Sequence, residues 1–97
     1  MQKFDFQTLE QVADDLQGKP VYLTIDLDVL DPSCFCGTGT PEAGGVSYNQ
    51  LLKAVFALKD LQIIGFDVNE LSPIYDQSGA STALACKFLR ELLLVFS

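Results

Sequence analysis

Apolar residues follow two patterns along this chain. They recur every three or four positions at about 6–16, 51–58 and 84–96, which predicts amphipathic helices. They are nearly continuous at about 19–26 and 61–68, as in strands that are covered on both faces of a parallel sheet. The order helix, strand, helix, strand, helix predicts an α/β segment in which the middle helix makes a right-handed crossover between parallel strands.

Polar residues mark where two of these helices begin. Ser47 followed by Gln50 predicts a capping box at the start of the middle helix. Thr8 and Gln11 have the same spacing near the start of the first helix, so we expect a second capping box there.

The first predicted strand ends in carboxylates. Asp26 and Asp28 precede Asp31 and Pro32, and Pro32 stops regular structure. If the strand continues through both residues, their side chains share one face and their carboxylates lie close together. Carboxylate oxygens suit Mn²⁺, Mg²⁺ or Ca²⁺. Strand-end acids also cap turns, so this pair alone leaves a metal site and a turn cap as equal alternatives.

The second predicted strand ends close to another carboxylate, that of Glu70. In open parallel α/β sheets, ligands bind beyond the carboxyl ends of the strands. We therefore expect Asp26, Asp28 and Glu70 to face one crevice, which favours a binding site. For Glu70, the alternative is an ion pair with a basic residue. Thr40 precedes Pro41 in the glycine-rich loop after the first strand, and its alternative to a binding role is that of a turn residue.

Two motifs extend this pattern. Asp-x-Asp-x-x-Asp-Pro at 26–32 leads into Gly-Thr-Gly-Thr-Pro-Glu-x-Gly-Gly at 37–45, and Phe-Asp-Val-Asn-Glu-Leu-Ser-Pro follows at 66–73. Together they closely resemble the ureohydrolases, the arginase and agmatinase family, and Pro-Ile-Tyr-Asp at 73–76 looks more like its agmatinase branch. The resemblance implies that residues 1–97 are a single segment, the C-terminal part of that domain. It also implies a partial arginase-type three-layer α/β/α fold with parallel strands.

The resemblance further implies a manganese-dependent hydrolase of guanidino groups, which converts agmatine to putrescine and urea in polyamine biosynthesis. Asp26 and Asp28 would be ligands of a two-manganese cluster that holds a hydroxide nucleophile. Glu70 would be the catalytic carboxylate that binds the planar guanidinium, and Thr40 would orient that group. Arginase or formiminoglutamase is the alternative within the enzyme class, and full-length members of the family form homo-oligomers.

The chain contains no histidine. The family resemblance implies histidine ligands and further aspartates from motifs upstream of Met1. We therefore expect that the chain alone does not hydrolyse agmatine at a useful rate. A non-catalytic fragment or interaction module is the alternative outside the enzyme class, because two strands with three helices would leave the sheet edges bare.

Composition adds three expectations. Thirteen acidic against six basic residues give a net charge of −7, which disfavours nucleic acid or an anionic membrane as partner and suits a metal or cationic ligand. The longest apolar run, 92–96, is too short to span a bilayer, and the N-terminus lacks a signal-peptide core. We expect Cys34, Cys36 and Cys86 to be reduced thiols of a cytoplasmic protein, with Cys86 in the core; a Cys34–Cys86 redox pair is the alternative.

Overall fold

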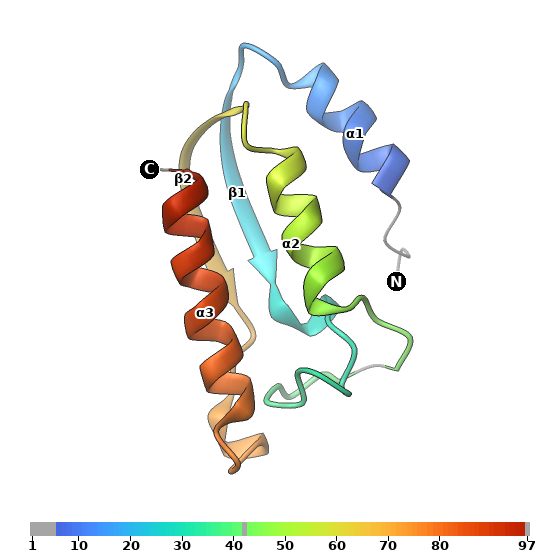
Figure 1. Cartoon of the computed structure of the whole chain (residues 1–97), viewed down its shortest axis with the longest axis vertical. Helices are drawn as coiled ribbons and strands as arrows, with labels where there is room; N and C mark the ends of the chain where they lie inside the picture. Colours follow the sequence, from blue (N-terminus) through green and yellow to red (C-terminus); the bar gives the residue numbers. More distant parts are fainter. Residues whose placement is uncertain (1–5, 42, 97) are drawn as a thin grey trace.

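The computed structural model describes residues 6–41 and 43–96, with the backbone alone at residue 6. It contains three α-helices, two strands and two single turns of 3₁₀-helix, in the order expected from the sequence (Figure 1). The elements are α1 Phe6–Asp15, β1 Pro20–Asp26, η1 Leu27–Val29, α2 Tyr48–Ala57, β2 Gln62–Asn69, η2 Pro73–Tyr75 and α3 Ala80–Val95. Within the described ranges, none of the helices combines the length and hydrophobicity needed to cross a bilayer.

β1 and β2 pair in parallel, as the apolar runs predict. Val21 lies beside Ile63 and Tyr22 beside Gly65, so the register shifts by one residue at this point. From there the pairing is regular to the end, where Asp26 lies beside Asn69. Both strands therefore end at the same edge of the sheet.

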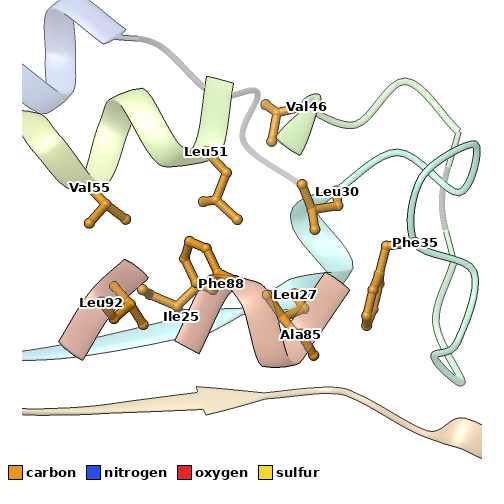
Figure 2. Packing of buried hydrophobic residues seen from close by; sticks show 10 residues of the cluster. All are labelled: Ile25, Leu27, Leu30, Phe35, Val46, Leu51, Val55, Ala85, Phe88 and Leu92. Carbon is orange, nitrogen blue, oxygen red and sulfur yellow. The ribbon is translucent and has the colours of Figure 1, made fainter. Parts of the chain in front are cut away.

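The main core lies between this sheet and the helices α2 and α3. Figure 2 shows side chains from β1, α2, α3 and the segment after β1 converging in this space. Burial of these apolar side chains is the main favourable contribution to the fold. The cluster consists of Ile25, Leu27, Leu30, Phe35, Val46, Leu51, Val55, Ala85, Phe88 and Leu92.

The other face of the sheet is open in the described part of the chain. Tyr22 of β1 is 59% exposed and Ile64 of β2 is 65% exposed. The apolar runs led us to expect cover on both faces, but these residues show cover on one. The described chain thus forms part of the expected layered α/β/α architecture.

The two expected capping boxes have different outcomes. At α2 the Ser47 hydroxyl accepts the Gln50 N–H at 3.1 Å, and the Gln50 side-chain oxygen accepts the Ser47 N–H at 2.8 Å. This capping box is confirmed. At α1 the expectation was wrong, because the helix begins at Phe6 and Thr8 already lies inside its first turn.

Cys86 is exposed on α3, so its expected place in the core was wrong. The buried positions of this helix are Ser81, Ala85, Phe88 and Leu92, which define its inward stripe. Cys86 follows Ala85 directly and is turned away from that stripe, because successive helical residues point in different directions. All three cysteines are free thiols.

The loop after β1 returns to lie directly on the chain that it left. The Val46 N–H donates to the Val29 carbonyl at 3.0 Å, and the Asp31 N–H donates to the Val46 carbonyl at 2.9 Å. A β-carbon at Gly45 would lie 2.5 Å from the Val29 oxygen and 2.6 Å from the Asp31 nitrogen. Only glycine allows so close an approach of backbone to backbone.

Replacing Gly45 with alanine should therefore lower the free energy of unfolding by more than about 1 kcal/mol, because backbone atoms must move apart. Gly39→Ala is the matched control, since its β-carbon would meet only the Tyr75 ring at an ordinary 3.6 Å. Urea denaturation of both variants measures the difference. Equal stability of the two variants would contradict the close approach at Gly45.

Candidate functional site

The carboxyl ends of the two strands bring candidate residues to one edge of the sheet. Asp26 is the last residue of β1, and its pairing partner Asn69 is the last residue of β2. Glu70 follows Asn69 directly, so Asp26 and Glu70 stand at neighbouring strand ends (Figure 1). Both residues are exposed. Their shared edge is the arrangement expected of a ligand site in a parallel α/β sheet.

Asp28 does not continue the strand. The expectation that Asp26 and Asp28 project from one face of a strand was therefore wrong. The chain turns into the 3₁₀-helix Leu27–Val29, and the Leu30 N–H donates to the Leu27 carbonyl at 3.1 Å. Leu27 and Leu30 are 0% and 1% exposed. A three-residue turn lets both leucines reach the core, which a continued strand would prevent because residues three apart lie on opposite faces.

A hydrogen bond joins two of the candidate residues. The Thr40 hydroxyl donates to the Oδ2 atom of Asp28 at 2.9 Å. The Thr40 N–H donates to the hydroxyl of Thr38, a residue that is only 2% exposed. The loop, which is anchored at the buried residue Thr38, thus brings the hydroxyl of Thr40, a candidate substrate-binding residue, to Asp28, a candidate metal ligand.

Asp31 holds the same loop, and its role was missed in the sequence. Its carboxylate accepts the Ser33 N–H at 3.0 Å and the Gly44 N–H at 2.9 Å. Hydrogen bonds from the side chain and backbone of Ser33, and from Gly44, hold the pKa of Asp31 below its ordinary value. The Asp-Pro-Ser sequence is typical of such turns and was the available signal.

The backbone of Glu70 is strained. Its φ angle is +76°, the one positive value among the non-glycine residues that the structure describes. Such a conformation costs on the order of 1–2 kcal/mol for a residue with a β-carbon. Strained backbones of this kind cluster at binding and catalytic sites.

A metal fits these residues only in part. The carboxylates of Asp26 and Asp28 provide hard oxygen donors of the kind that Mn²⁺ or Mg²⁺ prefers. Across the described ranges, however, no group of three or more His, Cys, Asp or Glu side chains is arranged to hold a metal ion. The described residues therefore supply at most part of a ligand set.

A surface cavity of about 280 Å³ lies elsewhere, between α2 and α3. Tyr48, Ala83, Leu84 and Lys87 line it. None of the candidate residues contributes to it. The candidate site is therefore an open edge of the sheet rather than this pocket.

The strain at Glu70 predicts a difference between two uncharged replacements. Asparagine adopts the left-handed conformation more readily than glutamine, so Glu70→Asn should be more stable than Glu70→Gln by about 1 kcal/mol. Both variants remove the same charge, and chemical denaturation of the pair isolates the backbone effect. Equal stability would show that the left-handed conformation carries no strain.

Known proteins resemble this chain over nearly all of its length. The profile of the Arginase family matches residues 1–95. The chain is 45% identical over 95 residues to an agmatinase of Bacillus anthracis, covering 95% of this chain and 33% of that protein. It is 48% identical over 97 residues to an agmatinase of Halalkalibacterium halodurans, covering 97% of this chain and 34% of that protein.

Solved structures of proteins with the same names also resemble this chain. A putative agmatinase from Clostridium difficile superimposes with a TM-score of 0.87 at 52% identity, over 95% of this chain and 34% of that one. An arginase from Bacillus caldovelox superimposes with a TM-score of 0.76 at 30% identity, over 89% of this chain and 30% of that one. The chain thus spans about a third of the length of these relatives. With the family profile matched over nearly the whole sequence, the chain belongs to the arginase family.

Proposed function

We propose that this chain is the C-terminal, carboxylate-bearing part of a manganese-dependent agmatinase, which hydrolyses agmatine to putrescine and urea. The observation that carries the proposal is the hydrogen bond from Thr40 to Asp28, beside the shared strand ends of Asp26 and Glu70. Residues 1–97 form one segment of that domain. A cytoplasmic homo-oligomer is part of the same proposal.

The agmatinase branch is favoured over arginase by the degree of similarity. The agmatinases of Bacillus anthracis, Halalkalibacterium halodurans and Bacillus subtilis share 43–48% identity with this chain, and the agmatine ureohydrolase of Thermoplasma volcanium shares 29%. Arginase structures share 30% and 34% in the Bacillus caldovelox and Bacillus subtilis proteins. Agmatine differs from arginine by lacking the carboxylate, so it is a purely cationic ligand and suits the acidic balance of this chain.

Each candidate residue has a distinct task in this proposal. Asp26 and Asp28 offer oxygen donors to metal, and the Thr40 hydroxyl holds one oxygen of Asp28 in place. Glu70 accepts N–H bonds from the guanidinium, a pairing strengthened by the opposite charges. When bound, two manganese ions would supply a hydroxide nucleophile at neutral pH.

The rest of the ligand set is not in this sequence, which has no histidine. We therefore expect the chain to need further polypeptide to become active. A non-catalytic interaction module is the second candidate. It is favoured by the exposed Tyr22 and Ile64 on the open face of the sheet.

A chimera tests the proposed activity. This chain replaces the matching third of the Bacillus anthracis agmatinase, and urea release from agmatine is measured with added Mn²⁺. We expect activity, and we expect Glu70→Gln to lower kcat/KM by about tenfold to a hundredfold because the charged hydrogen-bond acceptor is lost.

Asp60→Asn is the matched control, because it also replaces a carboxylate with an amide, at an exposed residue in the turn between α2 and β2. It should leave kcat/KM unchanged. A folded chimera that is indifferent to Glu70→Gln would refute the role of Glu70. Urea release from arginine in preference to agmatine would refute the proposed substrate.

A further inference from the structure

The loop that carries Thr40 is anchored at Gly37 against the segment after β2. The Gly37 N–H donates to the Ser81 hydroxyl at 2.9 Å, and the Ser72 N–H donates to the Gly37 carbonyl at 2.6 Å. A β-carbon at Gly37 would lie 2.7 Å from that of Ser81. The loop backbone is thus in direct contact with the first turn of α3.

Asp76 fixes the direction of the Ser81 hydroxyl. That hydroxyl donates to the Oδ2 atom of Asp76 at 2.6 Å, which leaves its oxygen free to accept the Gly37 N–H. The Ser81 N–H also donates to the same Oδ2 at 2.9 Å. Ser81 is 1% exposed and its hydrogen bond with Gly37 is buried, so water competes little for that bond. Hydroxyl groups of Ser78 and Ser81 hold the pKa of Asp76 well below its ordinary value, which keeps it ionised.

The anchor lies close in sequence to both candidate ligand-binding residues. Gly37 precedes Thr40 by three residues, and Thr40 bonds to Asp28. Ser72 follows the strained Glu70 by two residues. One contact at Gly37 therefore ties the Thr40 loop to the Glu70 segment.

We propose that Asp76 and Ser81 are positioning residues that act through Gly37 to set the separation of Thr40 and Glu70 for a guanidinium ligand. The identity of the ligand rests on the proposed function. The mechanical link between the two segments does not, because it follows from the hydrogen bonds alone.

A pair of serine variants tests the link in the full 97-residue chain. Ser81→Ala removes the hydroxyl that joins Asp76 to Gly37. Ser78→Ala removes a hydroxyl that donates to the other oxygen of the same carboxylate at 2.5 Å but makes no bond to Gly37. Each variant loses a hydroxyl beside the start of the same helix, and they differ in the tie to the loop.

Amide hydrogen exchange by NMR is the first measurement. In Ser81→Ala we expect protection of the Gly37 and Ser72 amides to fall about tenfold, the effect of one lost hydrogen bond, with altered amide shifts at Thr40 and Glu70. Ser78→Ala should leave these four amides unchanged. Unchanged amides in Ser81→Ala, or an equal loss of protection throughout α3 and the strands, would overturn the proposal. Should Ser81→Ala not fold, Asp76→Asn with Asp60→Asn as control gives the same comparison.

Agmatine titration of the same proteins with Mg²⁺ is the second measurement, because Mg²⁺ suits carboxylate ligands and, being diamagnetic, does not broaden the signals that are read. We expect ligand-induced shifts at Thr40 and Glu70 that need about tenfold more agmatine in Ser81→Ala but not in Ser78→Ala. Equal titrations in the two variants would overturn the positioning role. If the unmodified chain shows no shifts with agmatine, the ligand assigned under the proposed function is wrong for this chain, and the hydrogen-exchange comparison alone decides the link.

Discussion

β1 and β2 run parallel and end side by side, with Asp26 beside Asn69. Because parallel strands cannot be joined by a tight turn, the chain needs a long crossover, here residues 27–61. That crossover contains α2, one of the two helices that cover the sheet, and the loop that returns to the strand ends. The parallel register thus decides where Asp26 and Glu70 lie and which segment can reach them.

The loop keeps its path through close contacts of two glycines, with backbone atoms at Gly45 and with a side chain at Gly37. Gly45 lies against Val29 and Asp31 at one end, and Gly37 lies against Ser81 nearer the tip. Both contacts leave no room for a β-carbon, so a residue other than glycine would not fit at either position. These two contacts hold the long loop in place without a large set of buried side chains. The bond between Thr40 and Asp28 depends on this fixed path, since Thr40 lies between the two glycines.

Much of the fold follows from the sequence because apolar spacing reports directly which face of an element is buried. The helices α2 and α3 and the parallel strands were predicted in this way, as was the edge shared by Asp26 and Glu70. The turn at Asp28 was not, since it depends on burying Leu27 and Leu30 together. The bond from Thr40 to Asp28 and the anchor at Ser81 also escaped prediction, because they join residues 12 and 44 positions apart through loop geometry.

Paramagnetic broadening by Mn²⁺ in NMR spectra of the 97-residue chain tests most directly whether these strand ends form one cation-binding edge. Mn²⁺ at low occupancy broadens the amides nearest to it. We predict that the signals of Asp26, Asp28, Thr40 and Glu70 broaden first. The exposed neighbours Asp14 and Asp15 of α1 serve as the internal comparison. Broadening that begins at Asp14 and Asp15, or that spreads evenly over all exposed carboxylates, would contradict the account.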